Sequence, residues 1–403
     1  MTASLISADG RSKPHRPIDG KRAFRLALLM AISLICAFIL AMNLSPGTMD
    51  YIEYWSSGTL LVHHLNPYSP EGIFALEKAH GFAHSSPLVM LNPPWTLILI
   101  SPLGFVGVRL GLFLWTLISG ACIFFSVCLL YPSLKDKHLA LLFAPAITCF
   151  VSGQSSPFLL LGFSLFLHFH RRRPFLAGAA LLLMLIKPHL FLVFWTVLAV
   201  DCLYQHRFTI LGGAVSSLGA ATAFAMCFDR HIWQQYFTML REFRVKQGFL
   251  PTLSMLLRIL IDVRAFWILF APSCLAALWG LWYYRSRREV WNWNVHGMLL
   301  MLVTILVSPY GFFTDEIVLL PAIVFALNSA EKRRYSGWIL FAMNSVALVI
   351  AMAVGAQLSS PAYIWTPLAW LAWFLYATHG FRGRDQNLVL QTAKASATEG
   401  QIA

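Results

Sequence analysis

Apolar runs of about twenty residues, each long enough to cross a bilayer, recur along the chain and constrain its fold more than any other feature. The first covers about residues 24–44 and the last about residues 361–379. A helix satisfies its own backbone hydrogen bonds in lipid, so each run is expected to be helical. Charged residues make up only 12% of the chain, about half their share in a soluble domain. We therefore expect an all-α, polytopic transmembrane helical bundle.

Two runs, 95–108 and 175–200, do not fit a simple count of spans. The first provides only roughly 21 Å of helix, against a ~30 Å hydrocarbon core. The second is interrupted at Lys187-Pro188. As one span it leaves residues 229–250 inside, and as two half-spans meeting outside it leaves them outside. We favour the broken version, because proline disfavours a helical residue before it and broken helices are tolerated where they line a cavity.

The total is then about 10 to 12 spans, the length of each being judged against the bilayer core. The other candidate spans are residues 110–131, 138–152, 156–170, 209–228, 252–284, 293–310, 314–330 and 337–356.

Basic residues gather in short loops between the apolar runs. The formal net charge is +13, which in a soluble protein suggests nucleic acid as a partner. In a membrane protein an excess of Lys and Arg marks the cytoplasmic loops instead, so no nucleic-acid partner is expected. The basic clusters lie at Arg11 to Arg25, Arg171 to Arg173, Arg285 to Arg288, Lys332 to Arg334, and Arg382 with Arg384.

This charge pattern predicts a multi-pass protein of the inner (plasma) membrane. Residues 1–23 form a basic cytoplasmic tail, residues 24–380 the transmembrane domain, and residues 381–403 a polar, disordered cytoplasmic tail. The first span delivers residues 45–93 to the outside as an external loop, where Lys78 is the only Lys or Arg. Within this loop "EGIFALEKAHGF" predicts a short helix along the interface. Its residues Ile73, Phe74 and Leu76 are expected to face lipid or protein.

The chain has no sequence signal for a metal ion or a nucleotide cofactor. Its seven cysteines are scattered without a C-x-x-C pair, as is typical of small core residues. No group of His, Cys and acidic residues has the spacing of a metal site, and no G-x-x-x-x-G-K-[ST] loop is present. We expect no metal and no cofactor.

Asp50 follows the first apolar run closely and stands among Tyr51, Tyr54 and Trp55. A carboxylate held at the outer interface suits a general base, and the aromatic rings beside it suit the faces of a sugar. The alternative is a solvated loop carboxylate or a helix N-cap.

Lys187 lies inside the interrupted apolar run. A charge at membrane depth costs roughly 3 kcal/mol or more, so such residues usually face a cavity or a partner. The functional interpretation is contact with an anionic phosphate, with His189 as a second donor. The alternative is that the side chain extends to a nearby interface, leaving only its stem in the apolar region.

Several polar residues have both a substrate-binding and a structural interpretation. Asn66 and Tyr68 suit a turn and a headgroup-level anchor as well as substrate contacts. Gln154 suits a hydrogen bond to a substrate hydroxyl or the closing of a tight glycine turn. Asp315 and Glu316 suit a sugar contact or the capping of a helix. The expected substrate-binding residues are Tyr54, Asn66, Tyr68, Gln154, Tyr310, Asp315 and Glu316.

Four polar clusters fall on one membrane face in this topology, so a site is expected there with lipid as its neighbour. They are "DYIEYW…NPY" from Asp50, "VSGQSS" at 151–156, "IKPHL" at 186–190 and "SPYGFFTDE" at 308–316.

In this order the clusters resemble glycosyltransferase family 87, a family of C-type, multi-spanning glycosyltransferases that includes polyprenol-phosphate-mannose-dependent mannosyltransferases. The resemblance extends over about residues 24–330. The Gly-Gln…Lys-Pro block at 153–194 is its most specific part, and "LNPYSP" at 65–70 and "NPPW" at 92–95 add to it.

The resemblance implies an outward-facing site, a polyprenyl-phosphate sugar donor, a lipid or glycan acceptor and inversion at the anomeric carbon. It implies a hexose as the sugar, with mannose as the first candidate. By the same resemblance Asp50 is the catalytic base, Lys187 faces the donor phosphate, and an acidic residue follows Ser-Pro-Tyr. "GFFTDE" departs from the family's Tyr-Asp pairing, so Asp315 and Glu316 remain alternatives for that position.

Two other functions are compatible with these residues. An intramembrane lysine in a discontinuous helix also suits a transporter or flippase of a lipid-linked glycan, although no internal repeat is evident. A non-catalytic scaffold in an envelope assembly complex is the third hypothesis.

Overall fold

The computed structural model describes residues 50–242, 250–329, 335–354 and 359–379, with isolated positions before residue 50. In these ranges the chain is helical and forms no strand, which confirms the all-α prediction. The predicted tails at 1–23 and 381–403, most of the first span and the basic loop at Lys332 lie outside the described residues.

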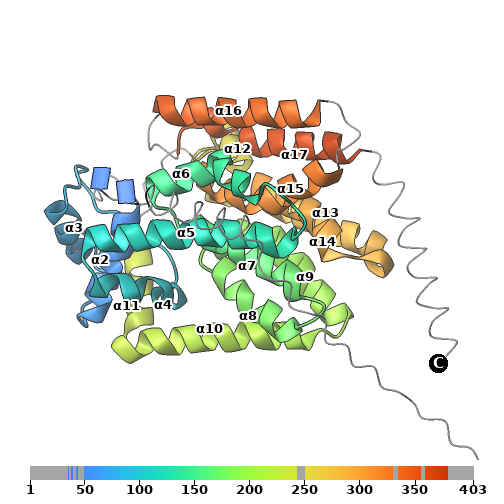
Figure 1. Cartoon of the computed structure of the whole chain (residues 1–403). Helices are drawn as coiled ribbons and strands as arrows, with labels where there is room; N and C mark the ends of the chain where they lie inside the picture. Colours follow the sequence, from blue (N-terminus) through green and yellow to red (C-terminus); the bar gives the residue numbers. More distant parts are fainter. Residues whose placement is uncertain are drawn as a thin grey trace, which may run out of the picture.

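Four of the described helices are long and apolar enough to cross a membrane. They are α5 (Val108–Leu130), α10 (Phe208–Phe228), the continuous helical stretch Phe266–Val290 that contains α13 (Ala271–Arg287), and α16 (Ser336–Val354). Figure 1 shows α5, α10 and α16 running in nearly the same direction. The prediction of a polytopic membrane bundle is therefore confirmed.

Shorter apolar helices fill the space between these four. The bundle core contains α6 (Ala144–Ser152), α7 (Ser156–Phe169), α8 (Pro174–Met184), α9 (Leu192–Tyr204), α14 (Trp293–Leu306), α15 (Leu320–Ser329) and α17 (Thr366–Thr378). The remaining helices are α2 (Tyr51–Val62), α3 (Pro70–Ala79), α4 (Leu97–Ile100), α11 (Ile232–Glu242) and α12 (Leu253–Ile261).

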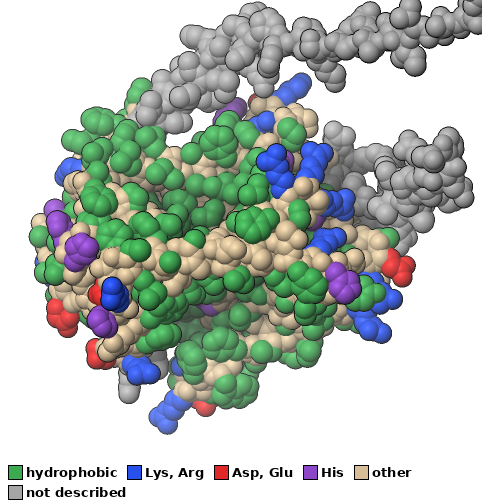
Figure 2. All heavy atoms as spheres, turned by 90° about the horizontal axis from the view of Figure 1, so that it is seen from below, with side chains coloured by type: hydrophobic (Ala, Val, Ile, Leu, Met, Phe, Trp, Pro, Cys, Tyr) green, Lys and Arg blue, Asp and Glu red, His purple; other side chains and the backbone are tan. Residues whose placement is uncertain are grey.

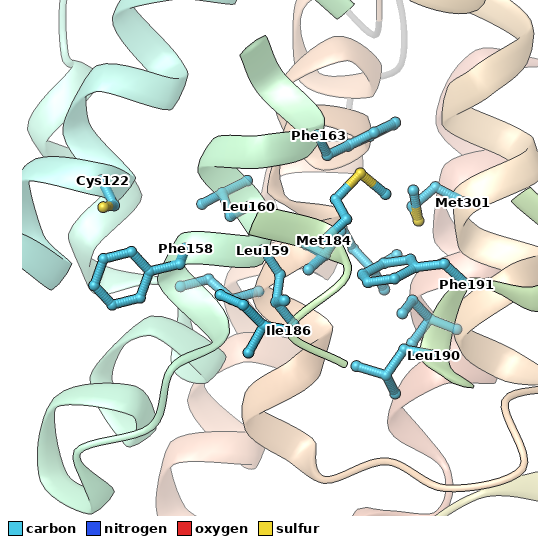
Figure 3. Packing of buried hydrophobic residues seen from close by; sticks show 14 of the residues in the cluster. Cys122, Phe158, Leu159, Leu160, Phe163, Met184, Ile186, Leu190, Phe191 and Met301 are labelled. Carbon is cyan, nitrogen blue, oxygen red and sulfur yellow. The ribbon is translucent and has the colours of Figure 1, made fainter. Parts of the chain in front are cut away.

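Apolar side chains and close backbone contacts hold the bundle together. Figure 3 shows Leu159, Phe163 and Met184 in one packed cluster with residues of neighbouring helices. Helices α8 and α10 touch through Gly178 and Gly213, where a Cβ on Gly178 would lie 1.9 Å from a backbone oxygen of α10. Small residues at such crossings let helix backbones approach closely in membranes.

Several predicted spans are divided in the structure, among them 138–152, where η4 (Lys137–Leu142) ends before α6 begins at Ala144. Residues 94–105 form three short helical turns, among them α4, and at roughly 18 Å they are too short to cross a bilayer alone. The predicted span 252–284 breaks between α12 and α13. There the carboxylate of Asp262 accepts a hydrogen bond from the Arg264 backbone N–H at 2.8 Å, and this local turn competes with continuation of the helix.

The surface of the molecule is largely apolar. Figure 2 shows hydrophobic side chains across the visible face, with Lys and Arg gathered mainly toward one end. On α16 the side chains of Phe341, Val349 and Met352 are all exposed. Such a belt matches a lipid environment and would be unusual on a soluble protein.

Polar residues stabilise the end of the bundle at which α9 and α13 terminate. The buried carboxylate of Asp201 accepts hydrogen bonds from Tyr284 and from the Trp293 indole, each at 2.9 Å. Arg207 lies 3.6 Å from the same carboxylate. These contacts join α9, α13 and α14.

The short helix predicted for residues 71–82 is present as α3 (Pro70–Ala79). Ser69 caps its N-terminus by accepting a hydrogen bond from Gly72 N–H at 3.1 Å. Ile73 is buried in the core, whereas Phe74 is only partly buried. Glu77, for which no buried position was expected, is also buried, and its carboxylate accepts the Leu88 N–H.

Candidate active site

The predicted break at Lys187-Pro188 is present and separates α8 from α9. Pro188 opens the 3₁₀ segment η5 (Pro188–Phe191), and Lys187 itself has a non-helical backbone. The break exposes carbonyls at the end of α8. Asn92 Nδ2 donates to the carbonyl of Ile186 at 3.0 Å, and the indole of Trp95 donates to that of Leu185 at 2.9 Å.

Asp50 lies directly before α2, in contact with the end of α6. Its backbone N–H donates to the carbonyl of Ser152 at 2.8 Å. Asp50 occupies the N-cap position, but its side chain makes no capping hydrogen bond. The carboxylate is therefore available for other interactions.

Gln154 joins Asp50 to Lys187. Gly153 ends α6 with φ of +71°, a left-handed conformation that glycine adopts without strain. The chain then turns so that Gln154 Nε2 donates to Asp50 Oδ2 at 2.5 Å. Gln154 Oε1 accepts from Lys187 Nζ at 2.9 Å. Since an amide nitrogen cannot accept and an amide oxygen cannot donate, only one orientation of this side chain satisfies both neighbours.

Lys187 is paired inside the protein. Its Nζ lies 2.8 Å from Asp315 Oδ1, and the ring of Phe312 lies 5.8 Å away. Only 7% of Lys187 is exposed, so its side chain does not extend to an interface. A lysine ammonium has three N–H groups, and no acceptor for the third is found among the described residues.

Asp315 is held from three directions. Besides Lys187, the hydroxyl of Ser156 donates to Oδ1 at 2.6 Å. The Phe312 N–H donates to Oδ2 at 2.9 Å. A buried carboxylate with this number of donors is stabilised in its charged form, so Asp315 serves as the counter-ion of Lys187.

Asp50 has a different electrostatic environment. Burial raises the pKa of its carboxyl above the ordinary value, and the Gln154 hydrogen bond and the Lys187 charge offset only part of this effect. The neutral amide of Gln154 separates Asp50 from Lys187, and Asp50 Oδ1 accepts no hydrogen bond from the described residues. Asp50 is thus the carboxylate better placed to take up a proton.

Aromatic residues surround this cluster. Tyr54 is buried beside it, with its hydroxyl 3.2 Å from Ser155 Oγ and its ring 5.4 Å from that of Trp115. The rings of His189 and Tyr310 also meet edge to face, with centroids 5.3 Å apart. The buried Nε2 of His189 has no hydrogen-bond partner among the described residues.

Asn66 and Tyr68 do not join the cluster. Asn66 accepts the backbone N–H of Tyr68 at 2.9 Å in a local turn. The hydroxyl of Tyr68 donates to the carbonyl of Asn92 at 3.1 Å. The two residues therefore support the loop that caps α8, and the contacts that the structure gives them are structural.

Glu316 points away from Lys187. One carboxylate oxygen accepts from Thr366 Oγ1 at 2.6 Å and the other from the Trp370 indole at 2.7 Å. Glu316 thereby ties η8 (Phe313–Leu319) to α17. Of the two adjacent acids left as alternatives by the sequence, Asp315 is the one that contacts Lys187.

Three residues in this region have contacts that were not predicted from the sequence, which indicates Trp95 only as an interface anchor. Ser156 contacts Asp315, and Asn92 and Trp95 cap the broken helix. All three lie inside motifs that the sequence does mark, "SGQSS" and "NPPW". Among the described residues, no three His, Cys or acidic side chains lie close enough together to hold a metal ion.

Fold and site together define a polytopic α-helical membrane protein with a buried cluster of charged residues at one end of its bundle. The model of glycosyltransferase family 87 matches residues 91–309, more than half of the chain. The chain belongs to this family, as its motifs predicted, and it is a glycosyltransferase. A search of curated proteins and a search of solved structures found no match.

Proposed function

We propose that the protein is an inverting glycosyltransferase that moves a hexose from a polyprenyl-phosphate donor to a lipid or glycan acceptor. Mannose is the first candidate for the hexose. The observation that carries the proposal is the hydrogen-bonded series Asp50–Gln154–Lys187–Asp315, which joins four residues far apart in the sequence. It sets a proton acceptor and a cation in one cluster, as displacement of a phosphate requires.

In this mechanism Asp50 is the general base. An acceptor hydroxyl attacks the anomeric carbon while Asp50 Oδ1 takes its proton. The new bond forms on the face opposite the departing phosphate, so the configuration inverts. The raised pKa of Asp50 favours this role, because a base works best when its pKa lies nearer the working pH.

Lys187 and His189 assist the leaving group. As the sugar–phosphate bond breaks, negative charge develops on the polyprenyl phosphate. The third N–H of Lys187 is suited to donate to that phosphate, while Asp315 and Gln154 hold the ammonium in place. His189, whose buried Nε2 has no partner among the described residues, is proposed as a second donor. Tyr54 and Tyr310 flank the cluster and suit contacts with the sugar.

We further propose that this site faces outward from the inner (plasma) membrane. Gln154 precedes α7 and the basic cluster Arg171 to Arg173 follows it, so the two lie at opposite ends of one helix. The positive-inside rule assigns the basic end to the cytoplasm. Residues 24–380 then form the transferase domain, with 45–93 as its first external loop.

The test uses purified protein in vesicles with a labelled polyprenyl-phosphate sugar and mixed lipid acceptors. Asp50→Asn is expected to lower turnover by about 10² to 10⁴, the usual contribution of a general base. Glu71→Gln, at an exposed carboxylate on α3, is the matched control and should retain activity. Equal turnover in wild type and Asp50→Asn would remove Asp50 from the role of base.

The same vesicles distinguish transfer from transport. A transferase yields a new glycosylated acceptor, whereas a flippase moves the lipid-linked sugar across the bilayer unchanged. Appearance of the sugar on the opposite side without any transfer product would favour the transporter hypothesis.

A further inference from the structure

Arg258, on α12, is a buried cation for which the described residues provide no anion. Only 4% of the residue is exposed. Its guanidinium carries five N–H donors, yet it makes no hydrogen bond and no ion pair with any described residue. Its Nε is fully buried and unsatisfied. Buried charges are normally paired or bind a ligand, because leaving one uncompensated is strongly unfavourable.

The neighbouring residues do not compensate this charge. The nearest partner is the ring of Phe266, 5.7 Å from the guanidinium carbon, and a ring face accepts only a weak interaction. Asp262 is exposed, and its Oδ1 accepts the Arg264 backbone N–H. Ser254, on the same buried face of α12, donates its hydroxyl to the carbonyl of Val307. Within the part of the chain that the structure describes, no group compensates the guanidinium charge.

The surroundings of Arg258 are those of a membrane surface. The residues that follow it on α12, Ile259 to Ile261, are exposed and apolar. Phe266 and Trp267, just past the break after α12, are also exposed. A short amphipathic helix with apolar residues and Trp on its outer side is typical of an element that lies at the headgroup level.

Arg258 is distinct from the Lys187 cluster. The N-cap residue of α12, Thr252, lies near Gly311, so this end of the helix adjoins the loop that carries Tyr310. Arg258 is six residues further on, roughly 9 Å along the helix axis. An anion bound at Arg258 would therefore lie beside the Lys187 cluster, in a separate site.

We propose that Arg258 binds the phosphate group of a membrane lipid, with the lipid's chains lying against the exposed apolar residues of α12 and Phe266. The planar guanidinium matches phosphate oxygens through two parallel hydrogen bonds. The ligand chemistry is a phosphate ester on an apolar tail. Both a prenyl phosphate and a phospholipid headgroup provide it, and the proposal does not depend on the transfer reaction.

The experiment measures lipid binding to the full-length protein by native mass spectrometry. Asp50→Asn protein is used as the parent, so that no lipid is consumed by turnover. The probes are farnesyl phosphate, dioctanoyl phosphatidylglycerol, dioctanoylglycerol, which lacks phosphate, and inorganic phosphate. Arg258→Gln is expected to weaken binding of a lipid phosphate by about tenfold or more, with binding of dioctanoylglycerol unchanged.

Two further variants separate ligand binding from folding. Arg264→Gln removes an exposed arginine from the loop that follows α12 and should bind every probe within about twofold of the parent. Arg258→Lys keeps the positive charge but removes the planar pair of N–H donors. It should weaken binding of the lipid phosphates about threefold or more, at an unchanged melting temperature.

The outcomes identify the source of the phosphate. If the Arg258 variants lose binding of farnesyl phosphate only, the site belongs to the prenyl carrier. If they lose binding of phosphatidylglycerol, the site belongs to membrane phospholipid. Binding of both lipids to the Arg258 variants at the parental level would overturn the proposal. Arg258-dependent binding of inorganic phosphate, with neither lipid bound better, would overturn the assignment to lipid.

Discussion

At the scale of single residues, the candidate site depends on an amide. Gln154 keeps Asp50 and Lys187 close together without letting them form an ion pair. A direct pair would lower the pKa of the carboxyl and occupy the ammonium. The amide leaves one Asp50 oxygen and one Lys187 N–H without a partner among the described residues.

Gln154→Ala is expected to lower transfer activity by about 10- to 100-fold. The change removes hydrogen bonds to two charged groups, and such bonds contribute about 1.5–3 kcal/mol each. The measurement is kcat/KM in vesicles with the lipid-linked donor. Gln234→Ala, at an exposed glutamine on α11, should be nearly neutral. A Gln154→Ala enzyme with wild-type kcat/KM would show that the bridge is dispensable.

The proposed role of Asp50 as general base predicts how the reaction depends on pH. A general base acts only when deprotonated, and burial raises the pKa of this carboxyl. Activity should therefore fall, as the pH is lowered, at a pH above the ordinary aspartate pKa of about 3.9. The check is the acid limb of kcat/KM against pH. A limb at or below that ordinary value, or one retained in Asp50→Asn, would contradict the assignment.

What the sequence predicts at this scale is uneven. Asp50 and Lys187 stand out in the sequence because a charged side chain beside or within an apolar membrane segment costs free energy. Gln154 is 104 residues from Asp50, and nothing local indicates that its amide connects the two. Asp315 and Glu316 are adjacent and chemically alike, so only their different directions in the fold separate the counter-ion of Lys187 from the anchor of α17.

At the scale of secondary-structure elements, the break between α8 and α9 shows how a discontinuous helix is stabilised. Pro188 predicts the interruption from the sequence. The carbonyls that it frees accept hydrogen bonds from Asn92 and Trp95, about ninety residues earlier in the chain. Because these are long-range contacts, the sequence identifies "NPPW" as a motif but does not predict that it caps α8.

Asn92→Ala is expected to reduce the free energy of unfolding by about 1–3 kcal/mol, because the buried carbonyl of Ile186 loses its donor. Activity should fall as well, since Lys187 is the next residue. The measurements are thermal unfolding in detergent and turnover in vesicles. Asn294→Ala, at a partly buried position near the start of α14, is the comparison and should change stability by less than about 0.5 kcal/mol.

The divided span at 252–284 has a similar origin. Its composition is mostly apolar despite Arg258, Asp262 and Arg264, and hydrophobicity alone therefore predicts one long helix. The Asp262 turn lies at the break, and α12 and α13 are separate helices. Composition detects membrane segments, but a break that depends on one side chain's local hydrogen bond is easily missed.

At the scale of the whole molecule, the apolar runs and the basic loops were sufficient to predict a polytopic all-α bundle. The apolar runs follow from the lipid core and the basic loops from the cytoplasmic side of the membrane, so neither depends on which helices are in contact. The arrangement that brings α2, α6, η5 and η8 to one cluster depends on packing among distant segments. The sequence predicted a common membrane face for them, and the structure adds the contacts.

The proposed orientation makes a labelling prediction. In cysteine-free protein, a single cysteine introduced by Glu71→Cys should react with a membrane-impermeant maleimide on intact cells. One introduced by Arg172→Cys should react only after permeabilisation, because the two positions lie on opposite sides in the proposed topology. Labelling of both from the same side would refute the outward-facing site.

The counter-ion of Lys187 lies late in the chain, and this has a consequence for biogenesis. Domains are synthesised from the N-terminus at about 5–20 residues per second. Asp50, Gln154 and Lys187 thus leave the ribosome before Asp315, which is 128 residues beyond Lys187. In a nascent chain that ends before η8, Lys187 cannot form its ion pair with Asp315. The charged cluster can therefore be completed only after η8 has been synthesised.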